Sequence, residues 1–320
     1  MRRAAIAIAT AAALLASATS AAADGGPVEA SYDPAGATAP GAPVRYVALY
    51  GKRSTIVAKV RRSGGEVVRS LALEGELAIP SVSVDGTADG LSADGRTLVL
   101  VRPRMRYERR RTVLTILDAR RLRVRKRLTL RGDFAYDALA PDGRTLYLVQ
   151  YLSGDLTHYA VRAYDLRAGR LRPDPIVDPR ERGEEMRGYP MTRLYGPRHR
   201  WAYTLYDGNG KEAFVHALDT VAGTARCIDL PMLRMQYAYD ARLALRAGGR
   251  RVAVYEPHGR ELATIDTRTF AASKPAARAP APPARTDDDG APVWPLAGLA
   301  LLLGAGAAVT VRRRRRPVTG

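Results

Sequence analysis

Arginine is the residue type in this chain most able to do chemistry, and it gathers in one stretch. Residues 102–131 hold 13 basic and two acidic residues. The whole chain has 51 Lys and Arg against 32 Asp and Glu, and without the arginines at positions 2, 3 and 312–316 the basic count falls to 44. Most of the remaining excess therefore lies in this one stretch. A guanidinium presents paired donors that match phosphate and carboxylate groups, so the stretch predicts a site for an anionic partner.

We expect that partner to be a wall polymer, an acidic glycan or a lipid headgroup, with a protein as a further candidate. Nucleic acid is disfavoured because Tyr107 is the only aromatic residue in the stretch. The alternative is that the charges guard the exposed edge of a sheet against pairing with another chain. The candidate ligand-binding residues are Arg104, Arg106, Arg109, Arg110, Arg111, Arg121, Arg123, Arg125 and Arg127.

The other reactive residue types form no recognisable catalytic pattern. Cys227 is the single cysteine, so no internal disulfide can form. The four histidines have no metal-ligand spacing to one another, to Cys227 or to a carboxylate, and they are His158, His199, His216 and His258. There is no nucleophile elbow and no phosphate-binding loop. The sequence therefore predicts no metal, no cofactor and no catalytic residue.

Tyrosine is the other overrepresented residue, with 16 Tyr against three Phe. Twelve of the tyrosines lie between Tyr136 and Tyr255. Tyrosine suits rigid, amphipathic binding surfaces, but it also favours β-strands in its own right. Both interpretations stay open.

One phrase occurs twice and defines the architecture. Ser92 begins SADGRTLVLV and Ala140 begins APDGRTLYLV. The strand after each such turn is followed by a second strand that ends in aspartate, at Asp118, Asp165, Asp219 and Asp266. A unit that recurs at about this period must stack on its own copies to bury its faces. Residues 44–270 therefore predict an all-β fold of repeated sheets.

These motifs resemble the YVTN and WD40-type β-propeller repeat families, with FVHALDTVAGTARCIDL from Phe214 as the nearest match to a YVTN unit. The resemblance covers residues 88–270 and implies about five four-stranded blades. It implies little about activity, because propellers carry many unrelated functions. An outer strand should alternate, and LRVRKRLTL from Leu122 places Leu122, Val124, Leu128 and Leu130 on one face. The other face would carry Arg123, Arg125, Arg127 and Thr129, with Lys126 out of register.

The two ends of the chain predict export and anchoring. Residues 1–23 have the layout of a secretory signal peptide, and residues 293–311 are an uncharged stretch long enough to span a bilayer as a helix. Five arginines follow directly, so the tail at 312–320 should be cytoplasmic and the domain should lie outside. Only five basic residues are Lys and Asn209 is the single Asn, a composition typical of a bacterium with a GC-rich genome.

Between these ends, residues 271–292 are rich in Pro and Ala and predict an extended stalk. Residues 24–43 predict a disordered N-terminal segment. The last repeat stops at Phe270 after its third strand, so residues 28–32 are expected to supply a fourth strand and close the last blade.

Two functions remain open from the sequence. The first is a membrane-anchored binding or scaffold module for an envelope component or a protein partner. The second is an exported propeller enzyme, a hydrolase or lyase with its site at the mouth of a central channel. Asp89, Asp137 and Asp240 precede inner strands and are the acids that such an enzyme would use. The alternative, which the repeat favours, is that they cap turns. Two or more carboxylates or histidines converging on the channel would favour the enzyme, and a polar but uncommitted channel with a charged blade edge would favour binding.

Overall fold

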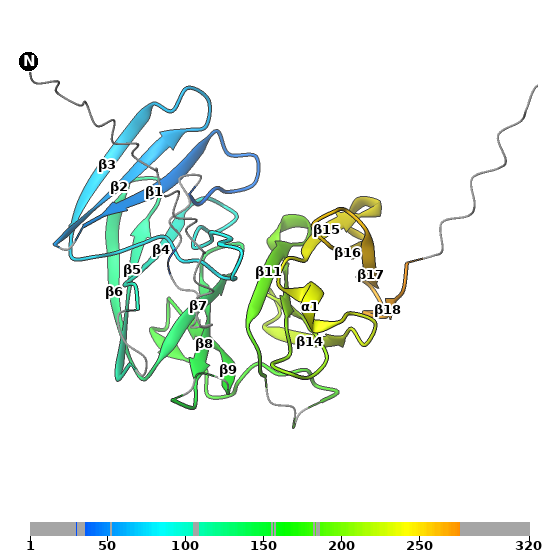
Figure 1. Cartoon of the computed structure of the whole chain (residues 1–320). Coiled ribbons are helices and arrows are strands. Elements are labelled where there is room, and N and C mark those ends of the chain that lie inside the picture. The colour runs from blue at the N-terminus through cyan, green and yellow to red at the C-terminus, as the bar shows by residue number, and fades with distance from the viewer. Residues whose placement is uncertain are drawn as a thin grey trace, which may run out of the picture. The chain divides into compact units, whose positions relative to one another are not determined.

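Short strands joined by tight turns make up nearly all of the structure, a computed structural model (Figure 1). It describes residues 30, 36–51, 53–104, 109–154, 156, 158–181, 183 and 186–275. The chain divides into two units, Met1–Ala276 and Ala277–Gly320, and every described residue belongs to the first. The described part is all-β, as the sequence predicts, and it forms five antiparallel sheets.

The first two sheets have three strands each. The first has the order β1-β2-β3, with β1 (Val44–Tyr50), β2 (Ser54–Arg61) and β3 (Val67–Glu74). The second has the order β4-β5-β6, with β4 (Thr97–Val101), β5 (Arg111–Asp118) and β6 (Arg123–Arg131).

The other three sheets have four strands each. The third contains β7 (Phe134–Leu139), β8 (Thr145–Tyr151), β9 (Tyr159–Asp165) and β10 (Arg170–Leu171). The fourth contains β11 (Pro190–Tyr195), β12 (Trp201–Tyr206), β13 (Phe214–Asp219) and β14 (Thr224–Asp229). The fifth contains β15 (Arg242–Arg246), β16 (Arg251–Tyr255), β17 (Glu261–Asp266) and β18 (Ala272–Ser273). Among the described residues, helical turns are limited to η1 (Pro197–His199), α1 (Met235–Ala238) and η2 (Ala247–Gly249).

The repeated phrase forms the same structure both times, which confirms the repeat. Its apolar halves are β4 and β8, and all five residues of β4 are buried. The four aspartates end β5, β9, β13 and β17. Each accepts main-chain N–H groups two or three residues further on, as Asp165 does from Arg167 and Ala168, both at 2.8 Å. An aspartate here closes the turn that leads to the outer strand.

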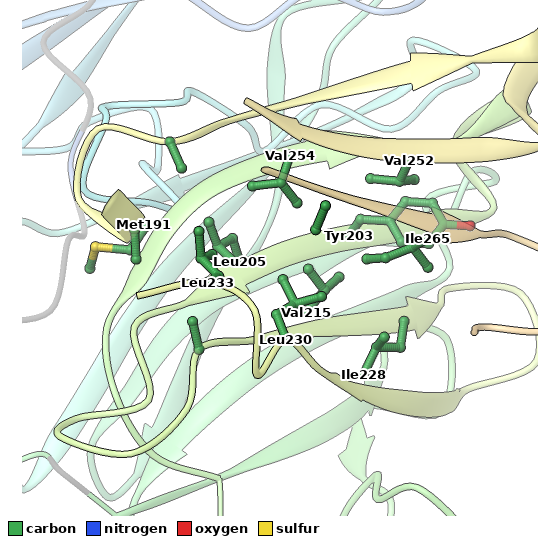
Figure 2. Packing of buried hydrophobic residues seen from close by; sticks show 14 of the residues in the cluster. Met191, Tyr203, Leu205, Val215, Ile228, Leu230, Leu233, Val252, Val254 and Ile265 are labelled. Carbon is green, nitrogen blue, oxygen red and sulfur yellow. The ribbon is translucent and has the colours of Figure 1, made fainter. Parts of the chain in front are cut away.

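Apolar side chains join each sheet to the next one along the chain. Val57 and Leu73 of the first sheet share a buried cluster with Leu98 of the second. Ile116 of the second lies in a cluster with Leu148 of the third. Figure 2 shows the largest cluster, where Met191, Tyr203, Leu205 and Val215 of the fourth sheet meet Val252, Val254 and Ile265 of the fifth. Burying one such Leu or Val stabilises the fold by about 1.5–3 kcal/mol.

The sheet edges differ from the expected five sets of four strands. On the side of β4 away from β5, the described residues form isolated β-bridges and no further strand, with Ala78 paired to Val101 and Leu91 to Leu98. The first sheet has one such bridge, from Ala37 to Tyr46 of β1. In the fifth sheet β18 pairs with β17, so residues assigned to the stalk supply a fourth strand there. The edge proposed for residues 28–32 is therefore occupied by β18. Of those five residues the structure describes only Ala30.

The predicted membrane segments fall outside the described residues, as do the signal peptide at 1–23 and the basic tail at 312–320. Among the residues that are described, no helix is both long and apolar enough to cross a membrane.

Candidate functional site

The fold divides the arginine-rich stretch between the two ends of the second sheet. In the pairing of β5 with β6, Arg111 lies opposite Arg131 at one end and Asp118 lies opposite Arg123 at the other. The eight residues of β5 separate these ends by about 24 Å at the usual rise of an antiparallel strand. The stretch is therefore not one patch. We name the two parts the loop end, with Arg102, Arg104, Arg109, Arg110, Arg111 and Arg131, and the turn end, with Arg120 to Arg125.

At the turn end three candidate arginines surround one carboxylate. Arg121, Arg123 and Arg125 lie 3.2, 3.9 and 3.5 Å from Oδ2 of Asp118. The arginine side chains are 70, 65 and 44% exposed, whereas the Asp118 side chain is 4% exposed. The main-chain N–H of Arg121 and the guanidinium groups of Arg121 and Arg125 lower the pKa of Asp118. We call these four residues the Asp118 cluster, and it presents more positive than negative charge to solvent.

Further basic residues continue the surface beside this cluster. Arg96 and Arg144 occupy the same position in the two copies of the repeated phrase. Their side chains are 59 and 76% exposed, and they lie 3.8 and 3.6 Å from the carboxylates of Asp94 and Asp142. The two turns touch, because the main-chain N–H of Asp94 donates to the carbonyl of Pro141 at 3.1 Å. Arg69 of the first sheet fixes the neighbouring turn by donating to the carbonyl of Arg121 at 2.8 Å. The turn end is thus a rigid, basic surface.

The expected single arginine face of β6 is wrong in part, because the strand contains a bulge. The pairing shifts between Ile116 and Leu117, so Lys126 lies opposite Ile116 while Val124 lies opposite Leu117, and Arg125 has no partner in the ladder. An extra residue reverses the faces of all residues beyond it. Accordingly Leu128 packs toward the third sheet, whereas Leu122 precedes the strand and packs toward the first.

The same bulge separates Arg127 from the Asp118 cluster. Arg127 pairs with Thr115, whereas Arg123 pairs with Asp118, and these two β5 residues are an odd number of positions apart. Side chains at odd separations in a strand point to opposite faces. Arg127 therefore lies on the other face of the sheet from Arg123.

At the loop end, one of the candidate ligand-binding arginines, Arg104, forms an ion pair inside the protein. Arg104 donates to both carboxylate oxygens of Asp133, at 2.6 and 2.5 Å, and the two side chains are 6 and 9% exposed. The main-chain N–H of Arg109 donates to the same carboxylate at 2.9 Å. Arg110 and Arg111 are exposed, and Arg106 lies outside the described residues. The loop end thus contains a buried ion pair and a second exposed basic surface, formed by Arg102, Arg110, Arg111 and Arg131.

Two of the three acids chosen from the sequence converge on the inner strands. Arg193 of β11 donates to the carbonyl and the carboxylate of Asp137 on β7, and its Nε donates to Thr204 at 2.8 Å. Two residues along β11, the Tyr195 hydroxyl donates to Asp89. This network joins the second, third and fourth sheets, because Asp89 precedes β4. Asp89, Asp137 and Arg193 are buried, with 8, 3 and 7% of their surface exposed, and Tyr195 is half-buried.

Burial controls the protonation of this network. Burial raises the pKa of Asp89, although the Tyr195 hydroxyl and the Arg193 charge act against it. Burial lowers the pKa of Arg193, but the Asp137 carboxylate more than offsets this and holds it above its ordinary value. His216 on β13 is 2% exposed, and burial lowers its pKa to about 4, so it is neutral at pH 7. The Asp137 carboxylate thus binds Arg193 and the Asp89 carboxylate binds Tyr195, and both interactions connect parts of the fold.

The third acid, Asp240, is exposed and lines a separate cavity. Sequence reasoning missed Arg193 and Tyr195. A signal for the pairing of Arg193 with Asp137 was present in the sequence. Two apolar inner-strand segments each contain one charged residue, Asp137 in FAYDAL and Arg193 in PMTRLY, and the two charges are opposite. Within the described ranges, no group of three or more His, Cys, Asp or Glu side chains could hold a metal ion.

Comparison with known proteins gives similarity at the level of structure. No protein-family model matches the chain, and no curated protein matches it. TolB from Acinetobacter baumannii is similar, with 16% identity, a TM-score of 0.43, and coverage of 74% of this chain and 52% of that one. A Lactobacillus plantarum protein has 14% identity, a TM-score of 0.45, and coverage of 78% and 72%. The β-propeller domain of Cps50 (Swd1) from Myceliophteria thermophila has 16% identity, a TM-score of 0.35, and coverage of 58% and 54%. This chain thus spans about half the length of the TolB chain.

Proposed function

We propose that this chain is a membrane-anchored, outward-facing binding module built as a β-propeller of the YVTN and WD40 type. Five sheets in chain order, with an aspartate closing the turn before the outer strand in four of them, support this architecture. The module binds an anionic envelope component, either a wall polymer, an acidic glycan or a lipid headgroup, at the Asp118 cluster.

The observation that carries this proposal is the charge balance of that cluster. Three exposed guanidinium groups share one buried carboxylate, so most of their charge and most of their donors remain available. Arginine donors of this kind suit phosphate, sulfate and carboxylate groups. Exposed charges are screened by salt over about 10 Å at 0.1 M ionic strength, so binding should weaken as salt is raised.

The enzyme alternative finds less support. A hydrolase or lyase needs a carboxylate or histidine that can exchange protons with a substrate. Asp137 is paired with Arg193, Asp89 is hydrogen-bonded to Tyr195, and both are buried. These groups contribute to the joining of three sheets.

The test compares two triple variants of the same sheet. Replacing Arg121, Arg123 and Arg125 with Gln should abolish retention on heparin, used as the glycan probe, and binding to vesicles containing phosphatidylglycerol, used as the headgroup probe. Binding to one probe alone would identify the chemistry of the partner. The matched control replaces Arg110, Arg111 and Arg131 with Gln, which removes the same charge from the loop end. Equal loss in both variants would mean that net charge alone determines retention, and the site would be refuted.

The proposed topology has its own test. Protease added to intact cells should digest residues 44–270 and leave a tag placed after Gly320 protected. Cutting the chain after Pro275, beyond β18, should release a soluble protein. A domain protected in intact cells would contradict the outward-facing topology.

A further inference from the structure

A cavity of about 570 Å³ lies between two segments that are far apart in the sequence. On one side the lining residues are Asp85 and Thr192, and Thr192 belongs to β11. On the other side they are Tyr239, Asp240, Arg242 and Leu243, where the chain leaves α1 and enters β15. Cavities of this size are typical of small-ligand sites. The Asp118 cluster is not part of its lining, so the cavity is separate from the site proposed above.

The Asp85 wall is held rigidly. The main-chain N–H groups of Val84 and Asp85 donate to the carbonyls of Pro190 and Met191, at 2.8 and 3.2 Å, which fixes this loop to β11. Asp85 Oδ1 accepts from the Ser83 hydroxyl at 2.7 Å and from the Thr87 main chain and hydroxyl at 3.0 and 2.7 Å. Burial acts to raise the pKa of Asp85, but hydrogen bonds from the side chains of Ser83, Thr192 and Thr87 and from the Thr87 main chain outweigh it and hold the pKa below its ordinary value. Asp85 is therefore a preorganised anion.

The other wall carries one charge of each sign. Asp240 and Arg242 are exposed, and within the described residues neither side chain forms a hydrogen bond or an ion pair. The Tyr239 hydroxyl lies 3.5 Å from the Asp207 carboxylate, beside this wall. The residues that line the cavity thus carry two carboxylates, one guanidinium and two hydroxyl groups.

We propose that this cavity binds a small zwitterion of the amino acid or short-peptide class. Its ammonium group lies near Asp85 and Asp240, and its carboxylate accepts from Arg242. The Tyr239 hydroxyl serves its polar backbone, and the Thr192 hydroxyl helps to hold the Asp85 carboxylate in position. A purely anionic ligand would meet two carboxylates and a purely cationic ligand would meet Arg242, so a ligand with both charges matches the cavity best.

The test measures binding of three related probes to the full-length protein in detergent by calorimetry. The first is alanyl-alanine, the second is its N-acetyl derivative, which lacks the ammonium, and the third is its C-terminal amide, which lacks the carboxylate. We expect saturable binding of alanyl-alanine and roughly tenfold or greater weakening for each blocked probe, as for the loss of one charge-assisted hydrogen bond.

Variants assign each charge to its residue. Arg242→Gln should weaken alanyl-alanine binding roughly tenfold and remove the difference between alanyl-alanine and its amide. Asp240→Asn should instead reduce the difference between alanyl-alanine and its acetyl derivative. Arg250→Gln, an exposed arginine in the turn before β16, is the matched control and should bind all three probes as the unmodified protein does. A thermal midpoint unchanged in every variant would show that the fold is intact.

Two outcomes would overturn this proposal. One is the absence of saturable binding of alanyl-alanine at millimolar concentrations, and the other is equal binding of all three probes. Heparin retention should be unaffected in Arg242→Gln and Asp240→Asn, because these residues are not in the Asp118 cluster. The two proposals can therefore fail independently.

Discussion

Arg193 and Asp137 form an ion pair that is buried between the third and fourth sheets. Their side chains are 2 and 3% exposed, and the arginine donates to the carbonyl of Asp137 as well as to its carboxylate. One carboxylate oxygen of Asp137 has no hydrogen-bond partner. Burying two charges costs several kcal/mol for each ion, and attraction within the pair offsets that cost only while both partners are present.

We expect Arg193→Met to destabilise the protein by about 3–5 kcal/mol, because it leaves the Asp137 carboxylate buried without its partner. The double variant Asp137→Leu with Arg193→Met should cost much less than the sum of the two single changes. Chemical denaturation of the four proteins measures the coupling. Additive losses would show that the two residues do not stabilise each other.

Stability should also depend on pH through His216. The pKa of this buried imidazole is about 4 in the folded protein, whereas the unfolded chain has the ordinary value of 6.5. The unfolded state therefore binds more protons between these values, and stability falls as pH falls through this window. Between pH 7 and pH 5 the loss should be about 2 kcal/mol.

His216→Gln should remove most of this loss, and comparing the two proteins at pH 7 and pH 5 by denaturation isolates it. The charged groups that influence His216 are Asp137, Arg193 and Asp178, and all three remain in the variant. The raised pKa of Asp89 acts in the opposite direction, since that group is stabilised as pH falls, and it too is common to both proteins. An identical pH slope in the variant would contradict the assignment.

The two glycines of the repeated phrase provide a matched pair. Gly95 and Gly143 both have positive φ, at 66° and 68°, so Ala is strained at either position by about 1–2 kcal/mol. An added Cβ at Gly95 would lie 3.7 Å from Ala39, an ordinary contact, whereas at Gly143 it would lie 2.4 Å from the Thr97 hydroxyl oxygen. We therefore expect Gly143→Ala to lower the unfolding free energy about 1–3 kcal/mol more than Gly95→Ala does. Equal losses in thermal or chemical unfolding would mean that Thr97 moves aside freely.

Charge on β6 should protect the edge of the second sheet. Within the described residues β6 pairs only with β5, and its bulge and its charged side chains are two recognised means of preventing edge pairing. Replacing Lys126 and Arg127 with Thr should increase light scattering of the purified protein over time, while heparin retention stays intact because the Asp118 cluster is untouched.

The control variant replaces Lys211 and Arg250, two exposed residues outside the strands, with Thr. It loses the same charge as the β6 variant but leaves the β6 edge unchanged. If both variants scatter light equally, reduced net charge rather than edge pairing causes the association. If neither does, the charges on β6 have no protective role.

The all-β class and the repeat could be predicted from the sequence because their causes are local. The turn residues of SADGRT and APDGRT, and the aspartates that end β5, β9, β13 and β17, act on main-chain groups only a few residues away. Short apolar runs between such turns leave few alternatives to strands. The expected face of LRVRKRLTL failed for a related reason. A bulge depends on the partner strand, and alternation within one strand carries no information about it.

The sequence alone determined the type of the elements, their order and the chemical character of the arginine-rich stretch. Tertiary structure decided that Arg111 and Arg123 lie at opposite ends of one sheet, that Asp137 meets Arg193, and that Asp85 shares a cavity with Arg242. Each of these relationships joins residues through strand pairing or through contacts between sheets. Such contacts form between segments distant in sequence, so their partners are selected by the packing of whole sheets and not by neighbouring residues.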